Sequence, residues 1–162
     1  MSGLCDLSHC FAVRPRTASG RILRTWPLPG AARVLLLIQG AEILMRILAN
    51  LLTALVAALH IYFLVLEMFL WDQPRGRRIF GTTPEFAAAS KALAANQGLY
   101  NGFLAAGLVW GLWLGGSGTA VKIFFLCCVV IAGVYGAYTV NRRILFVQAA
   151  PAALTLGLLL MS

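Results

Sequence analysis

The sequence predicts an all-α integral membrane protein, folded as a four-helix up-down bundle. Composition is the first reason: of 162 residues, 60% are hydrophobic and only 11% are charged, and the mean hydropathy is +0.85. A soluble domain is usually about half apolar and roughly a quarter charged. The second reason is a series of long apolar stretches, and the third is that short segments rich in Gly, Pro and charge separate them.

The apolar stretches cover residues 47–71, 98–114, 121–140 and 144–161. A helix that crosses a bilayer needs roughly 17 to 25 mostly apolar residues. The first and third stretches satisfy this clearly, whereas the second and fourth are near the lower limit. Because helices joined by short loops pack most simply as antiparallel neighbours, we expect one transmembrane domain over residues 45–162.

The segment between the first two stretches predicts a short cytoplasmic helix. Thr83 is a suitable N-cap, because Pro84 follows at the first helical position and Glu85 lies in the first turn. The Ala-rich residues 85–97 then continue as a helix. This helix either lies on the membrane surface or runs straight into the second span.

Basic residues indicate the orientation in the membrane. The opposite side of the expected bundle has only Arg46 and Lys122. Cytoplasmic loops carry an excess of Lys and Arg, so we expect the basic loops in the cytoplasm and both termini outside. The charges do not form one soluble face, and nucleic-acid binding is therefore not expected. The loops after the first and third stretches carry Arg75, Arg77, Arg78, Lys91, Arg142 and Arg143.

Residues 1–44 have no clear periodicity and resemble no good signal peptide. One interpretation is a disordered basic leader that touches anionic headgroups. The other is that translation begins at Met45 and that the leader is a mis-assigned extension. We favour the second, because an arginine-rich leader opposes a topology with the N-terminus outside.

The polar side chains of the first stretch fall on one helical face. Exposing a carboxylate to hydrocarbon costs at least a few kcal/mol, on the order of 2.5–3.5 by insertion scales. We therefore expect His60 and Glu67 to face the other helices. Steps of three and four residues place on that face Asn50, Thr53, Ala57, His60, Leu64, Glu67 and Trp71.

These residues predict a cytoplasm-facing polar pocket around Glu67, with His60 as its floor. A satisfied network of interhelical hydrogen bonds, in which Glu67 pairs with Arg142 or Arg143, explains the pattern of Glu67 equally well. For His60, we favour the second explanation, a neutral histidine that takes part in the hydrogen bonds between helices. On the third and fourth stretches we expect inward-facing stripes of Cys128, Ile131, Tyr135, Tyr138 and Arg142, and of Gln148, Pro151 and Thr155. The pocket candidates are His60, Glu67, Asn96, Gln97, Asn101, Tyr138, Arg142 and Gln148.

No motif predicts a cofactor or a metal. The adjacent Cys127 and Cys128 point in different directions on a helix, and no Cys/His spacing of a metal site occurs. Walker, dinucleotide and catalytic-triad motifs are absent from the sequence. Small residues four apart indicate close helix packing or a dimer face. They are Gly98 and Gly102, then Gly107, Gly111 and Gly115, then Ala132 and Gly136.

Three segments resemble a known family. They are "LHIYFLVLEMFLW", "RGRRIFGTTPEFAAASKALAANQGLYNGFLAAGL" and "GVYGAYTVNRRILFVQAAPAAL". In this order they resemble the small bacterial membrane family called domain of unknown function thirteen-oh-four, over Met45 to Met161. The resemblance implies a four-span protein of the bacterial inner membrane. It implies no reaction, ligand or catalytic residue.

The first functional hypothesis is a non-enzymatic multi-pass protein of the inner membrane. It binds or passes a small solute through the Glu67 pocket, with the lipid bilayer and a second copy of the chain as partners, since one small bundle has little room for an aqueous path. The rival is a membrane enzyme or redox partner that uses His60, Glu67 and the tyrosines on a lipid-soluble substrate such as a quinone. A third hypothesis is a structural or accessory membrane subunit.

Overall fold

The computed structural model describes residues 29–162, and the first part of the predicted leader, residues 1–28, lies outside the described residues. The described part is helical throughout, without strands. Its elements in order are α1 (Pro29–Phe69), α2 (Pro74–Phe80), α3 (Pro84–Trp113), the 3₁₀ turn η2 (Gly115–Gly118), α4 (Thr119–Thr139), the π-helix η3 (Leu145–Ala149) and α5 (Ala150–Met161).

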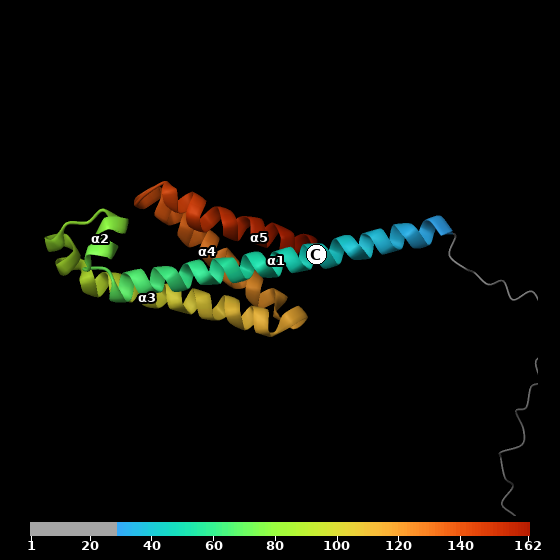
Figure 1. Ribbon diagram of the computed structural model, residues 1–162, viewed down its shortest axis with the longest axis horizontal. Helices are drawn as coiled ribbons and strands as arrows, with labels where there is room; N and C mark the ends of the chain where they lie inside the picture. The colour runs from blue at the N-terminus through green and yellow to red at the C-terminus, as the bar shows by residue number, and fades with distance from the viewer. Residues whose placement is uncertain (1–28) are drawn as a thin grey trace, which may run out of the picture.

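The four longer helices pack side by side around a narrow core (Figure 1). Helix α1 contacts α3 and α5, and α4 contacts the same two helices. The core between them contains Val56, Leu108, Leu126 and Val129. Helix α2 and the turn between α4 and α5 lie at one end, whereas η2 and the chain's C-terminus lie toward the other (Figure 1). The two predicted basic loops therefore occupy the same end of the molecule.

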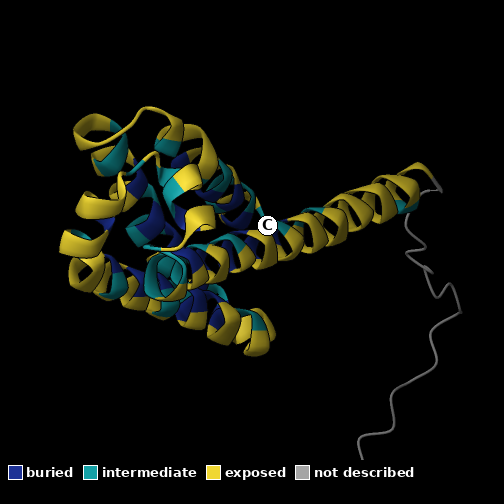
Figure 2. Cartoon of the chain, turned by 60° about the vertical axis from the view of Figure 1, so that its left-hand side comes forward, coloured by how far each residue is buried: buried dark blue, intermediate teal, exposed yellow. Residues whose placement is uncertain are grey.

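Helix α1 begins well before the predicted first span. One of the two interpretations of residues 1–44 was a disordered leader, and for residues 29–44 that interpretation is wrong, because they form the first turns of α1. Ala and Leu, which are common in residues 29–44, favour helix, and a helix that is already nucleated extends at little cost. These turns project beyond the other helices with apolar side chains exposed (Figures 1 and 2).

Helix α3 confirms the predicted cap. Thr83 accepts a hydrogen bond from the Phe86 N–H at 3.3 Å, and Pro84 and Glu85 occupy the first turn. The Ala-rich residues do not form a separate surface helix. They continue without interruption into the predicted second span, and the one helix α3 runs through Gly98 to Trp113. The separate short helix is instead α2, which starts at a proline and ends at Phe80, directly before Gly81 with φ 68°.

Glycines set the closest helix contacts. A Cβ on Gly107 would lie 2.2 Å from the Phe125 ring, and one on Gly133 would lie 2.9 Å from the backbone nitrogen of Ala149. Gly107 therefore packs within the chain, between α3 and α4. Gly115 has φ 60° and lies past the end of α3, so it does not extend the predicted stripe of Gly107 and Gly111.

Two described helical stretches are long and apolar enough to cross a membrane, Gly30–Phe69 and Gly115–Thr139. The last helical stretch, Leu145–Met161, is apolar but shorter. It begins with the π-turns of η3, directly before Pro151. A proline donates no backbone hydrogen bond, and π-turns are a common local adjustment in such a helix.

Candidate functional site

The middle of the predicted polar face of α1 is buried against the other helices, whereas Asn50 near its start is exposed. His60 is 1% exposed, and Thr53 and Ala57 are buried with it. Glu67 and Leu64 are half-buried on the same face. The expectation that His60 and Glu67 point inward is therefore confirmed.

Three side chains form a continuous hydrogen-bonded chain between α1 and α3. The Asn101 side chain lies between the other two: its Oδ1 is 2.7 Å from His60 Nδ1, and its Nδ2 donates to Glu67 Oε2 at 2.7 Å. An amide oxygen only accepts, so His60 Nδ1 carries the hydrogen. Donation thus runs from His60 through the Asn101 amide to the Glu67 carboxylate.

Small residues on α3 allow this contact. Gly98 lies one turn before Asn101, and a Cβ on it would approach Glu67 Cβ to 3.1 Å. Gly102 similarly faces the Leu64 side chain. The two glycines bring the α3 backbone close to α1, so that the short Asn101 side chain reaches both His60 and Glu67.

The structure does not bring the other predicted pocket residues into this chain. Asn96, Gln97 and Arg142 are exposed, and Tyr138 is 90% exposed. Gln148 is half-buried in η3 and has no hydrogen bond to the chain among the described residues. Only three of the eight candidates, His60, Asn101 and Glu67, form the hydrogen-bonded chain.

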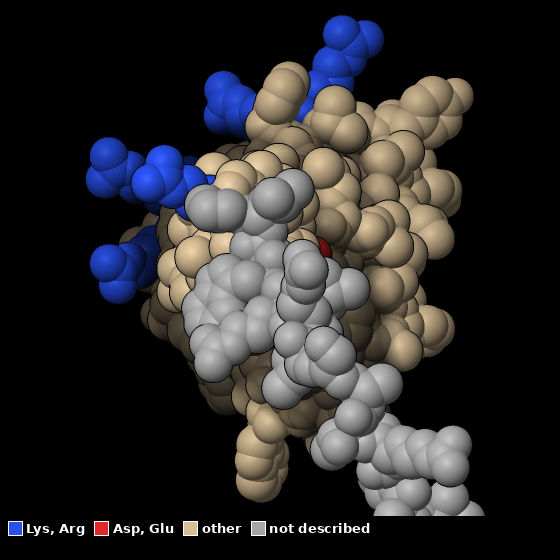
Figure 3. Space-filling model, turned by 90° about the vertical axis from the view of Figure 1, so that its right-hand side faces the viewer, with Lys and Arg blue, Asp and Glu red and all other residues tan. Residues whose placement is uncertain are grey.

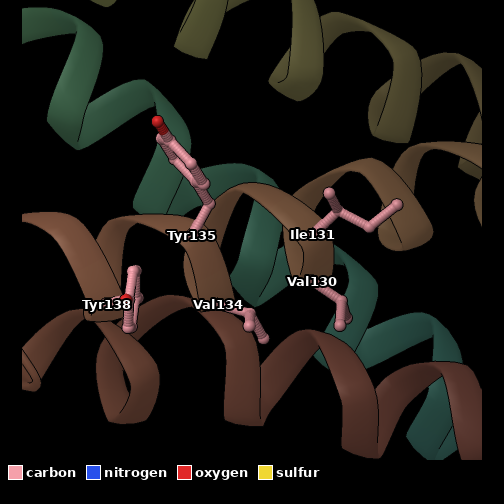
Figure 4. A pocket seen from close by; sticks show the side chains of 5 residues that line it. All are labelled: Val130, Ile131, Val134, Tyr135 and Tyr138. Carbon is pink, nitrogen blue, oxygen red and sulfur yellow. The ribbon is translucent and has the colours of Figure 1, made fainter.

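The predicted inward stripe on the third helix is wrong. Ile131, Tyr135 and Tyr138 point outward and line a shallow hollow of about 430 Å³ together with Val130 and Val134 (Figure 4). The inward face of α4 is offset from that stripe, because Gly133 must face Ala149 of η3 for α4 to pack closely against the last helical stretch. The inward residues are Lys122, Leu126, Val129 and Gly133.

Glu67 forms no ion pair with the arginines that follow α4. Within residues 29–162 the ion pair that the structure contains is Lys91 with Asp72, at 2.7 Å. This hydrogen bond to Lys91 lowers the pKa of the Asp72 carboxyl. The pair joins the end of α1 to the first turns of α3, beside a hydrogen bond from Trp71 Nε1 to Ser90 Oγ at 3.0 Å.

Sequence reasoning missed a second polar contact, between α1 and α4. The ammonium of Lys122 donates to Asn50 Oδ1 at 2.9 Å, and Lys122 is 4% exposed. The available signal was a single lysine inside an apolar run, which we assigned only to topology. Among the described residues no three His, Cys, Asp or Glu side chains lie close enough to hold a metal ion.

The His60–Asn101–Glu67 chain has the chemistry of a hydrogen-bond relay that ends in a carboxylate. One oxygen of Glu67 is bonded to Asn101, and an ionised carboxylate has room for further donors. The chain can therefore hold a positively charged group or a proton at Glu67. The buried imidazole orients Asn101 from the other side.

Comparison with known proteins identifies the family of the chain but assigns no reaction to it. The chain is 30% identical to the "Uncharacterized protein YpaA" of Lactococcus lactis subsp. lactis (strain IL1403) over 114 residues, which cover 69% of this chain and 96% of that protein. No solved structure matches the chain. The model of the family described as "Protein of unknown function (DUF1304)" matches residues 54–160, a range that contains the whole hydrogen-bonded chain. The protein therefore belongs to this family, as its motifs predicted.

Proposed function

We propose that the protein is a multi-pass membrane protein that binds a small cationic solute at Glu67, on the cytoplasmic side of the membrane. The observation that carries the proposal is the Glu67 carboxylate itself. It is half-buried, is held by Asn101, and has no basic partner among the described residues. An acid placed in an apolar environment is costly unless it is paired.

The orientation rests on charge. Arg75, Arg77 and Arg78 lie in α2, and Arg142 and Arg143 lie in the turn after α4. Both elements lie at the same end of the molecule as the C-terminal end of α1, the part of that helix that contains Glu67 (Figure 1). Because basic loops stay in the cytoplasm, this end is the cytoplasmic one. A solute thus reaches Glu67 from the cytoplasm.

Cysteine labelling tests the topology. In a variant without its native cysteines, Gln73→Cys and Ser117→Cys report on the two ends of the molecule. A membrane-impermeant maleimide should label Ser117→Cys in intact cells and Gln73→Cys only in inverted vesicles. Labelling of both positions from the same side would show that α3 does not cross the membrane and would exclude the four-span arrangement.

The solute is sought by thermal unfolding of the detergent-purified protein with inorganic monovalent cations and small primary amines. A bound solute raises the unfolding temperature by mass action, equivalent to about 2.7 kcal/mol at a hundred times its Kd. We expect the shift in the wild type and not in Glu67→Gln, which keeps the size of the side chain and removes its charge.

Glu85→Gln is the matched control, because Glu85 is an exposed carboxylate at the start of α3. It should retain the full shift. An equal shift in Glu67→Gln, or no shift with any cation or amine, would mean that the hydrogen-bonded chain serves only to dock α1 on α3.

One observation supports the second candidate function, an enzyme or redox partner for a lipid-soluble substrate. The hollow on α4 is apolar and offers Tyr135 and Tyr138 to a molecule in the bilayer (Figure 4). However, its lining residues all come from α4, and neither His60 nor Glu67 contributes. A quinone retained after mild purification, and released by Tyr135→Ala, would favour this role.

A further inference from the structure

A second polar site lies at the opposite end of the protein from Glu67. A cavity of about 340 Å³ opens there between α1, η2, the start of α4 and the end of α5. This volume is at the small end of the range of roughly 300–1,000 Å³ for small-molecule pockets. Its lining consists of Arg46, Asn50, Gly115, Gly116, Thr119, Lys122, Leu159 and Ser162.

The buried cation in this cavity has no acidic partner. Lys122 is 4% exposed and donates one hydrogen bond, to Asn50 Oδ1 at 2.9 Å. An ammonium has three N–H donors, and no carboxylate of residues 29–162 forms an ion pair with it. Burial of an unpaired charge is strongly unfavourable, so this arrangement is suited to a negatively charged ligand.

Two further features make the cavity positive. Lys122 lies in the first turn of α4, where the helix dipole already carries partial positive charge and disfavours a cation. Arg46 adds a guanidinium, of which one N–H already donates to an oxygen of Ser162, the last residue of the sequence, at 3.2 Å, so the carboxyl group there offsets part of this charge. The remaining N–H groups of Arg46 are free of hydrogen bonds to described residues.

The rest of the lining suits an oxyanion. Gly115 and Gly116 present backbone without side chains, and the Thr119 side chain adds a hydroxyl to the lining. Acidic side chains are scarce in the whole sequence, which has 5 Asp and Glu against 13 Lys and Arg. On the face seen in Figure 3, acidic colour is confined to one small spot, whereas several basic side chains project.

We propose that this cavity binds a phosphate group between Arg46 and Lys122, at the N-terminus of α4. Guanidinium and ammonium groups are the usual protein partners of phosphate. The phosphate belongs either to a free phosphate ester or ion, or to the headgroup of an anionic lipid. The two sources share the same recognition chemistry and are separated by the experiment below.

The experiment measures thermal unfolding of the full chain in two arms. In the first arm, protein in a neutral detergent receives inorganic phosphate, with chloride at equal ionic strength as the reference. In the second arm, protein is placed in nanodiscs of phosphatidylcholine alone or with phosphatidylglycerol. A shift in the first arm identifies a free phosphate, and a shift in the second arm alone identifies a lipid headgroup.

Lys122→Met and Arg46→Gln should each weaken the apparent affinity for phosphate, taken from the concentration dependence of the shift, about tenfold to hundredfold. The reason is that a charge-assisted hydrogen bond is worth about 1.5–3 kcal/mol. Lys122→Met also removes the buried charge and should raise the unfolding temperature without ligand. Arg46 is exposed, so Arg46→Gln remains informative if Lys122→Met does not fold.

The control is Arg143→Gln, an exposed basic residue at the other end of the molecule. It should respond like the wild type. The proposal is overturned if neither arm produces a shift, or if Arg46→Gln and Lys122→Met respond as strongly as Arg143→Gln, since that result indicates general attraction to a basic protein.

Discussion

Asn101 donates a hydrogen bond to Glu67 at 2.7 Å, although the two residues lie on different helices and 34 positions apart. The amide also accepts from His60, which is 1% exposed. A single short side chain thus forms hydrogen bonds with two ionisable groups of α1. This relationship fixes both the rotation of α1 and its height relative to α3.

Replacement of Asn101 with leucine should therefore destabilise the protein although the side chain is similar in size. The change removes two interhelical hydrogen bonds. Such bonds average about 0.6 kcal/mol in membrane proteins, with a maximum near 1.7, so we expect a loss of about 1–3 kcal/mol. Unfolding of the purified protein in mixed detergent micelles measures it.

Asn96→Leu is the control for that substitution, since Asn96 lies on the same helix with an exposed side chain. It should change the free energy of unfolding by less than about 0.5 kcal/mol, as is usual for surface positions. Equal effects of the two substitutions would show that Asn101 makes no special contribution to the docking of α1 and α3.

Gly133→Ala should weaken the contact between α4 and the last helical stretch. The new methyl would lie 2.9 Å from both the Cβ and the backbone nitrogen of Ala149. A backbone atom cannot move aside as a flexible side chain does, and overpacking typically costs about 1–3 kcal/mol. Thermal unfolding measures the effect.

Gly157→Ala provides the comparison, because a Cβ at Gly157 in α5 meets nothing within 4 Å. Alanine is favoured over glycine in a helix by roughly 0.5–1 kcal/mol, so this variant should be neutral or slightly more stable. The opposite order of the two variants would contradict the close packing at Gly133.

The Asp72–Lys91 pair predicts a stability difference that depends on pH. The pKa of Asp72 is lowered in the folded protein, chiefly by its hydrogen bond to Lys91. The pair therefore contributes fully above the ordinary aspartate pKa of about 3.9 and is lost as the pH falls through the lowered folded pKa. The Asp72 and Lys91 side chains are 27% and 55% exposed, so solvent and salt screen the contribution.

Lys91→Gln should raise the pKa of Asp72, measured by NMR titration of its carboxyl carbon. The small difference in stability between wild type and Lys91→Gln at neutral pH should disappear below the folded pKa. Lys91→Arg keeps the charge and should keep most of the lowered pKa. An unchanged Asp72 titration in Lys91→Gln would show that the pair does not form.

Periodicity predicted the buried face of α1 correctly because one helix obeys one geometric rule. Polar residues at steps of three and four must share a face, and burial of an acid in an apolar segment requires that face to turn inward. The Thr83 cap was predictable for the same reason, since its hydrogen bond lies within four consecutive residues.

The partners of that face were harder to predict, because the rotation of each neighbouring helix depends on packing. On α4 the polar stripe of Tyr135 and Tyr138 suggested an inward face, but the close contact of Gly133 with Ala149 decides the rotation and turns the tyrosines outward. Lys122 was assigned to topology because its partner, Asn50, lies 72 positions away in the sequence and on another helix.

The direction of donation in the hydrogen-bonded chain gives the last prediction, the tautomer of His60. An ionised Glu67 accepts from Asn101 Nδ2, which leaves Oδ1 to face the ring and requires a hydrogen on Nδ1. Most neutral histidines in solution carry the hydrogen on Nε2 instead, so the ¹⁵N spectrum of histidine-labelled protein distinguishes the two forms. We expect a protonated Nδ1 for His60 in the wild type and loss of that preference in Asn101→Leu. A wild-type spectrum with hydrogen on Nε2 alone would reverse the Asn101 amide, and Glu67 would then have to be the protonated donor of the chain.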